Sequence, residues 1–226
     1  MNKTIGKVRV DAGMVSLIKE EDVKLFAKRG TGNLLGFAFW GRDREQTSES
    51  MKKIGIGVND LKTVSFISVS DLEEEVLQQF YEYIQQDNVK VVVHPVHDNP
   101  YDRLFIEDTT KMRVQTEREE LFYTSSTYFG DGVYNVFENK GTNTFHAFFG
   151  DEVHVSVELL TNQLDTIEVT EPTNYLFADP CYLGYEETHG TTITLQPGVK
   201  YYVYQMIDAE DQLPVSLIVT GRKAVN

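Results

Sequence analysis

The stretch that decides the fold is TVSFISVSDLEEEVLQQFYEYIQQDNVKVVV, residues 63–93. It begins with a β-like run at 63–69 and ends with a β-branched run at 89–93, and apolar residues recur between them at helical spacing. Ser70 and Glu73 form a capping box, which predicts that a helix begins there. The segment therefore predicts a strand–helix–strand unit, with a helix over 71–86 between two neighbouring parallel strands.

Short β-like runs separated by turn signals dominate the rest of the chain. Two runs within 5–18 flank Asp11-Ala12-Gly13 and predict a hairpin. Residues 20–29 predict a short helix, 34–40 predict a buried strand, and 42–53 fit either a helix or a loop. Further strands are predicted at 134–137, 145–149, 153–159, 193–195, 201–207 and 215–219.

Two β-like regions share one order of features. Residues 132–150 and 198–221 each open on a glycine, continue through an aromatic-rich run and a polar turn, and return as a second run. A duplicated hairpin unit explains this similarity, and two hairpins of separate origin explain it equally well. The fold class expected is α+β: a β-rich antiparallel frame made of 1–19 and 121–226, with or without a duplicated hairpin unit, and an inserted βαβ segment within 20–120.

The amino-acid composition disfavours one kind of partner and excludes some kinds of protein. The 226 residues carry a net charge of −14, which disfavours direct binding to nucleic acid because phosphates require clustered Lys and Arg. This acidity serves solubility, or it provides a surface that competes with nucleic acid for a basic partner. A single cysteine excludes an internal disulfide, and no apolar run approaches the ~20 residues that span a bilayer.

These features predict a protein of the cytoplasm of a bacterial-type cell, without a membrane segment or a signal peptide. The sequence has no Walker-type phosphate loop, no dinucleotide-binding glycine pattern and no cysteine pair for zinc, so no cofactor is expected. The oligomeric state is not predicted.

His94-Pro-Val-His97-Asp98 is the best candidate for catalysis. It follows the predicted strand 89–93, and ligands bind beyond the carboxyl ends of parallel strands. The strand at 63–69 is expected to bring Ser68 and Ser70 to the same edge. His94, His97 and Asp98 fit a divalent metal site or a general base, and they also fit two loop histidines and a turn-forming Asp.

Other residues have both a functional and a structural interpretation. In Asp179-Pro-Cys-Tyr182, Cys181 fits a nucleophile that needs a base such as His189, or a buried structural cysteine. Asp131, between two glycines, fits a ligand for a cation or a backbone amide, or a tight turn. His146 and His154 lie in strand patterns and are interpreted as packed or surface histidines.

Two strings resemble a group of small, uncharacterised bacterial and phage proteins. They are Gly130-Asp-Gly-Val-Tyr-Asn-Val136 and Ala178-Asp-Pro-Cys-Tyr-Leu183, and Asp11-Ala12-Gly13 is similar to the turn that precedes the second string in that group. Here the order differs, because Asp-Pro-Cys-Tyr comes last, and residues 20–120 have no counterpart. The resemblance implies a phage or mobile-element origin and implies no activity.

Three functions remain open. The first is a non-enzymatic accessory protein of a phage or mobile element that binds a host or defence protein, with Asp131, Asp179 and Tyr182 as candidate binding residues. Its twelve tyrosines suit an interface and suit a β-rich frame equally. The second is a small metal-dependent hydrolase or phosphoesterase that uses His94, His97 and Asp98, and the third is a structural component of a virion.

Overall fold

The computed structural model describes residues 2–11, 13–28, 32–61, 64–71, 74–86, 88–98, 100–103, 106, 113–115, 121–150, 158–183 and 189–222. The chain divides into two compact units. The frame unit is made of residues 1–27 and 109–226, and the inserted unit is made of residues 28–108. The sequence predicts a longer insertion, 20–120, but most of the 3₁₀ helix η1 (Glu20–Lys28) and strand β7 (Arg113–Gln115) lie in the frame unit.

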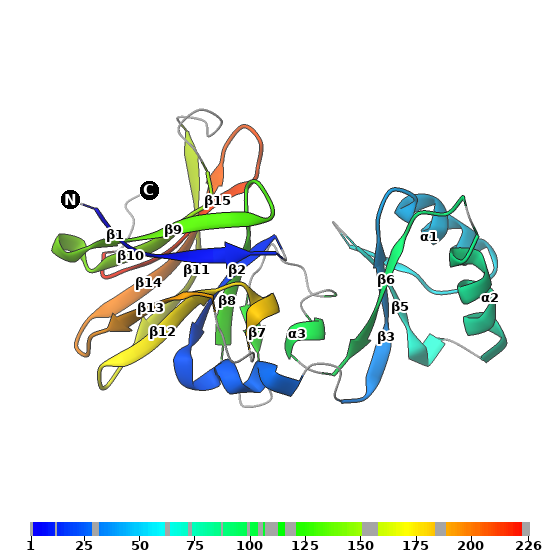
Figure 1. The fold of residues 1–226 in the computed structure, drawn as a ribbon, viewed down its shortest axis with the longest axis horizontal. Coiled ribbons are helices and arrows are strands. Elements are labelled where there is room, and N and C mark those ends of the chain that lie inside the picture. The colour runs from blue at the N-terminus through cyan, green and yellow to red at the C-terminus, as the bar shows by residue number, and fades with distance from the viewer. Residues whose placement is uncertain are drawn as a thin grey trace. The chain divides into compact units, whose positions relative to one another are not determined.

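The frame unit contains two antiparallel sheets (Figure 1). The six-stranded sheet has the order β1 (Lys3–Val10), β9 (Gly132–Asn139), β10 (Thr144–Phe148), β15 (Pro214–Thr220), β14 (Lys200–Asp208) and β11 (Leu159–Glu168). The five-stranded sheet has the order β13 (Thr191–Leu195), β12 (Thr173–Ala178), β2 (Met14–Lys19), β8 (Leu121–Ser126) and β7. Two 3₁₀ turns, η3 (Lys140–Thr142) and η4 (Pro180–Tyr182), follow β9 and β12.

One apolar core joins the two sheets. Alternate residues of each strand point inward, as a half-buried sheet requires. Val8 and Val10 of β1 lie in the same core cluster as Val15 and Leu17 of β2. The two sheets therefore form a sandwich whose first two strands lie on opposite sides of the core.

The predicted hairpin within 5–18 is wrong. β1 pairs with β9, whereas β2 pairs with β12 and β8, so the chain crosses from one sheet to the other at Asp11–Gly13. A turn signal between two alternating runs does not distinguish a hairpin from such a crossing. Both arrangements bury the same alternate residues, and only the pairing partners differ.

The two later hairpins form as expected. β9 pairs with β10, and β14 pairs with β15, while β10 and β15 lie side by side. Tyr134 and Val136 are buried, as are Tyr201 and Val203, which fits equivalent roles in the core. Their origin by duplication stays a prediction. The predicted strand 153–159 falls mostly on 151–157, outside the described residues, and β11 begins at Leu159.

The inserted unit is a four-stranded sheet with helices. The sheet has the order β4 (Asn59–Asp60), β5 (Ser65–Ser68), β3 (Leu34–Trp40) and β6 (Val92–His97). The helical segments are α1 (Arg44–Lys53), η2 (Val69–Asp71), α2 (Glu74–Ile84) and α3 (Pro100–Arg103). Residues 42–53, which fit either a helix or a loop, are therefore largely helical.

The prediction of two neighbouring parallel strands is wrong. β5 and β6 run in the same direction on either side of α2, but β3 lies between them and pairs antiparallel with both. The apolar run of β3 takes the centre of the sheet because it buries more surface there than at an edge. Of the capping box, Ser70 lies in η2, and Glu73 lies outside the described residues.

α1 and α2 lie beside the sheet of the inserted unit (Figure 1), and apolar side chains of both helices form one cluster with those of the sheet. Phe80 of α2 packs against Phe37 and Phe39 of β3, with ring centroids 6.2 and 5.9 Å away. Asp60 ties α1 to the sheet, because its carboxylate accepts hydrogen bonds from Ser48 and Lys52 of α1 and from Ser65. Desolvation opposes ionisation of Asp60, but these hydrogen bonds outweigh it and lower the pKa of the carboxyl to about 2.

Two hydroxyls are buried without a described partner, and they give the first test. Ser16 and Thr124 lie opposite each other in β2 and β8, and neither side-chain oxygen has a hydrogen bond. The substitution Thr124→Val keeps the shape and removes an unpaired polar group, so the free energy of unfolding should rise by about 1 kcal/mol. Denaturant unfolding measures this change.

The matched control is Ser125→Ala on the same strand. The Ser125 hydroxyl accepts a hydrogen bond from Gln205 Nε2 at 3.0 Å and donates to the Ser126 carbonyl at 3.0 Å. Its loss leaves the Gln205 amide unpaired and should lower stability by about 1–3 kcal/mol. Lower stability in Thr124→Val would show that its hydroxyl is satisfied in solution.

Candidate functional site

The crossing at Asp11–Gly13 is held by two carboxylates from distant parts of the chain. The Asp11 N–H donates to Asp179 Oδ2 at 2.5 Å, and the Gly13 N–H donates to Asp131 Oδ1 at 3.1 Å. The Thr127 N–H donates to the Gly13 carbonyl at 2.8 Å. The three strings that carry the resemblance therefore meet at one end of the frame unit, although the sequence separates them widely.

Asp179 is a structural carboxylate with two backbone donors. It is fully buried, and besides the Asp11 N–H it accepts the Cys181 N–H at 2.6 Å. It is thus the N-cap of η4, and Pro180 suits the first position because that position needs no N–H donor. The Asp-Pro-Cys-Tyr string is explained by this cap.

The loop before β9 is ordered in a similar way. Gly130 has a φ of +77°, a conformation that favours glycine, and its carbonyl accepts hydrogen bonds from Thr127 and from Tyr134 Oη. Asp131 is exposed but binds the Gly13 N–H. Asp131 therefore acts as a clamp between two loops in this structure.

Tyr182 lies on the surface above this clamp. Its hydroxyl donates to Asp11 Oδ2, and this hydrogen bond is the main reason that the pKa of Tyr182 rises to about 12. Arg9 lies over the ring, with its guanidinium carbon 6.0 Å from the centroid, and His189 packs edge-on at 5.4 Å. A tyrosine, a cation and a carboxylate are thus fixed beside one another.

One exposed apolar side chain borders this group, and another belongs to the loop before β9, which is bound to the crossing. Val133 is 61% exposed and pairs with Arg9 across β1 and β9. Phe129 is 48% exposed, and the Tyr128 ring packs against it at 4.8 Å. We name the set Arg9, Asp11, Phe129, Val133, Tyr182 and His189 the crossing surface.

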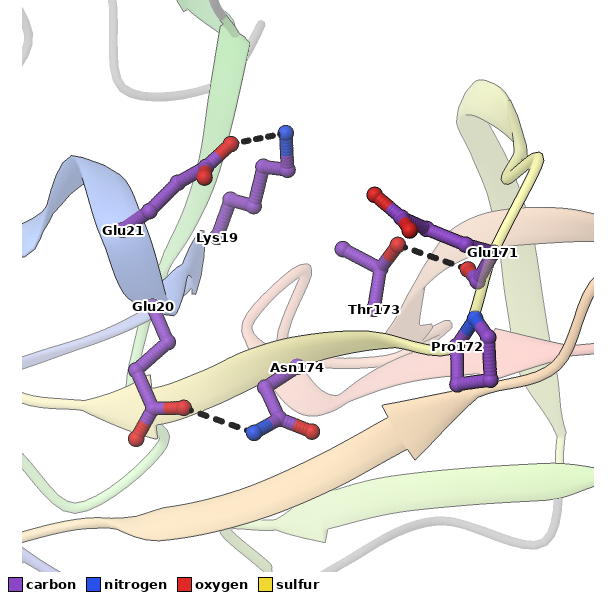
Figure 2. Close-up of a pocket in the computed structure, with 7 residues that line it drawn as sticks. All are labelled: Lys19, Glu20, Glu21, Glu171, Pro172, Thr173 and Asn174. Carbon is purple, nitrogen blue, oxygen red and sulfur yellow. Dashed lines mark hydrogen bonds and ion pairs between the residues drawn. The ribbon is translucent and has the colours of Figure 1, made fainter.

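An acidic pocket lies at the opposite end of the five-stranded sheet, where β2 ends and β12 begins (Figure 2). Its volume is about 360 Å³, and it is lined by Lys19, Glu20, Glu21, Glu171, Pro172, Thr173 and Asn174. Lys19 pairs with Glu21, which lowers the pKa of the Glu21 carboxyl, and Glu20 accepts a hydrogen bond from Asn174 at 2.8 Å. Three of the lining side chains are carboxylates and one is a lysine, so the surface of the pocket is acidic.

The predicted catalytic histidines lie within strand β6, not beyond its end. The strand runs from Val92 to His97, because the β-branched run pairs with β3 further along than the sequence predicts. Ser68 lies at the same end of the sheet as His97, with β3 between them, and its hydroxyl is 2.8 Å from that of Ser70.

A buried carboxylate that the sequence did not single out joins the two histidines. Asp102 is 2% exposed; its Oδ2 lies 2.9 Å from His97 Nδ1, and its Oδ1 lies 3.2 Å from His94 Nε2. The His97 backbone N–H also donates to Asp102 at 2.9 Å. Asp98 points elsewhere and pairs with Arg103.

This geometry differs from a metal site built by His94, His97 and Asp98. Within the described ranges, no group of three or more His, Cys, Asp or Glu side chains could hold a metal ion. A carboxylate bonded to an imidazole instead fixes the orientation and tautomer of the ring, as in general-base catalysis. Asp102 lies in α3, and its position two residues after Pro100 is the only feature of the sequence that could have pointed to this carboxylate.

The remaining candidates have structural surroundings. His146 is half-buried, stacks on Phe137 at 5.0 Å, and burial lowers its pKa. His154 lies outside the described residues. Cys181 is half-buried, and His189 packs on its neighbour Tyr182.

Comparisons of the chain with protein-family models, curated protein sequences and solved structures gave no match. Among the helices of the described segments, none is both long and apolar enough to cross a membrane. The contacts of the chain itself therefore guide the functional assignment.

The alkaline titration of Tyr182 tests the hydrogen bond from its hydroxyl to Asp11. Tyrosinate absorbance is titrated in the wild type and in Tyr182→Phe, and the difference between the two curves belongs to Tyr182. Its midpoint should lie near pH 12, because the neutral phenol donates to Asp11. In Asp11→Asn the midpoint should fall toward the ordinary value of about 10. Circular dichroism of the same samples controls for unfolding, and a wild-type midpoint near 10 would mean that the hydrogen bond does not form.

The substitution Asp179→Asn tests the buried cap. An amide offers one oxygen where two N–H donors converge, so the free energy of unfolding should fall by about 2–3 kcal/mol. The control is Asp131→Asn, since Asn Oδ1 still accepts the single Gly13 N–H, and its effect should stay within about 0.5 kcal/mol. Equal effects of both changes in denaturant unfolding would contradict the different roles.

Proposed function

We propose that this chain is a non-enzymatic accessory protein of a phage or mobile element, and that it binds a host or defence protein through the crossing surface. The exposure of Val133 beside Arg9 and Tyr182, together with that of Phe129 in the loop before β9, supports the proposal most directly. Exposed apolar groups beside Tyr and Arg are typical of interface centres, where such residues carry most of the binding energy.

Order in the loops favours binding. Hydrogen bonds from backbone N–H groups tie the Asp11–Gly13 crossing to the loop before β9 and to η4, and their acceptors are the carboxylates of Asp131 and Asp179 and the Gly13 carbonyl. A surface that is already ordered loses little conformational entropy when a partner docks, so more of the contact energy appears as affinity. This is the advantage of loops held on a rigid sandwich.

Charge indicates the kind of partner. The chain carries −14, and three carboxylates belong to the crossing surface or to its neighbours. Asp11 is part of it, Asp131 accepts the Gly13 N–H, and Asp211 accepts from the hydroxyl of Tyr128, which packs on Phe129. A complementary partner presents an apolar patch bordered by Lys and Arg, and nucleic-acid-binding host proteins are a class with such basic surface. Such charges also raise the association rate at low ionic strength.

A small hydrolase or phosphoesterase is the second candidate, and Asp102 is the observation that favours it. By accepting from His97 Nδ1, Asp102 leaves His97 Nε2 as the nitrogen that could take a proton. The metal-dependent form of this proposal uses Asp98, whose carboxylate is engaged by Arg103. The metal-independent form therefore fits the geometry better.

Affinity capture from a bacterial lysate distinguishes the two candidates. The double substitution Phe129→Ser with Val133→Ser should reduce the amount of captured partner at least tenfold, because it removes apolar contacts without disturbing buried residues. The triple substitution His94→Ala, His97→Ala and Asp98→Ala should leave capture unchanged. Thermal melts confirm that each variant folds.

The opposite pattern would overturn the proposal. If the wild type recovers no protein and hydrolyses a chromogenic phosphodiester, and His97→Ala abolishes that hydrolysis, the chain is an enzyme. A partner that is captured equally by the Phe129 and Val133 double variant binds elsewhere, and the crossing surface is then not its site.

A further inference from the structure

Strand β11 is a long edge of the six-stranded sheet. It has ten residues, and in the order of the described strands it pairs with β14 alone. Every second backbone N–H and C=O of an edge strand points away from the sheet and can pair with another strand. Strand addition at such an edge is a common mode of protein association.

The other described edges carry features that oppose strand addition. β6 contains Pro95, which cannot donate a backbone hydrogen bond. β1 presents Lys3, Lys7 and Arg9 and contains a bulge. β4 and β7 have two and three residues. β13 begins at Thr191, whose hydroxyl donates to the Lys7 carbonyl of β1 at 2.9 Å, so β1 lies against the start of this strand.

Only the second half of β11 is protected in this way. A bulge lies between Gln163 and Asp165, and Asp165 accepts a hydrogen bond from Tyr123 Oη at 3.0 Å. The first half, Leu159–Gln163, contains no charge and no proline. Its residues pair regularly with Asp208–Tyr204 of β14, so the free side is regular as well.

Exposed leucines gather at the start of this half. Leu159 and Leu160 are 38% and 43% exposed. Leu213 is 38% exposed, and its carbonyl accepts the Asp208 N–H at 2.8 Å, which places it beside the residue that pairs with Leu159. A second strand laid along this edge would cover apolar surface and make backbone hydrogen bonds.

We infer that the occupant of this edge is β11 of a second copy of the chain, paired antiparallel about a two-fold axis. Centred on Thr161, the pairing opposes Leu159 to Gln163, Leu160 to Asn162 and Thr161 to itself. Two chains of charge −14 repel each other over most of their surface, and Leu159–Gln163 is a neutral stretch at which they can approach. An isologous contact of this kind closes as a dimer.

Sedimentation equilibrium of the full chain tests the dimer. The double substitution Thr161→Lys with Gln163→Lys places the two lysines introduced at position 161 opposite each other across the axis and sets each lysine at position 163 against an apolar Leu159, so the dimer dissociation constant should rise at least tenfold. The matched control is Thr192→Lys with Thr194→Lys on exposed positions of β13, which adds the same two charges. It should leave the constant unchanged or lower it, because the net repulsion falls.

Hydrogen exchange of the wild type gives a measurement that needs no variant. Amides of Leu159–Gln163 should become more protected as protein concentration rises, while those of β13 should not. The inference fails if the wild type stays monomeric at every concentration, if both double variants weaken the dimer equally, or if the dimer forms without added protection in β11. It is independent of the proposed function, since a monomer could still bind a partner through the crossing surface.

Discussion

The arrangement of the frame unit depends on the buried carboxylate of Asp179. It accepts one N–H from the crossing between the first two strands and one from η4, joining segments 168 residues apart. A buried carboxylate without donors would be costly, so the two loops must stay together for the fold to persist. The positions of Tyr182 and Asp11 on the surface depend on this buried contact, because Asp179 binds the backbone of Asp11 and of the residue before Tyr182.

Local patterns in the sequence predicted elements better than pairings. The apolar run of β3, the helix before β6 and the β9–β10 and β14–β15 hairpins follow from spacing and turn residues over short distances. The partners of β1, β2, β5 and β6 did not follow, because alternation determines which face of a strand is buried but not which strand lies beside it. β12 was missed because its apolar run, Tyr175–Ala178, is only four residues long, whereas β3 spans seven.

The same distinction holds for the candidate sites. His94 and His97 stand out in a chain with five histidines, but their carboxylate partner is set by the turn that carries Asp102. Asp131 and Asp179 were singled out as candidate binding residues, yet their shared role of holding Asp11–Gly13 depends on contacts between residues more than a hundred positions apart. Sequence spacing contains no information on such contacts unless related sequences vary together.

The crossing at Asp11–Gly13 also determines the order in which the protein can acquire structure on the ribosome. Synthesis proceeds from the N-terminus, so β1 and β2 emerge well before β8, β9 and β12, with which they pair. The sheet of the inserted unit uses strands that all lie between residues 34 and 97, so that unit can form on the nascent chain first. The N-terminal strands meanwhile remain unpaired, which makes them natural clients for a chaperone until Ala178 has left the exit tunnel.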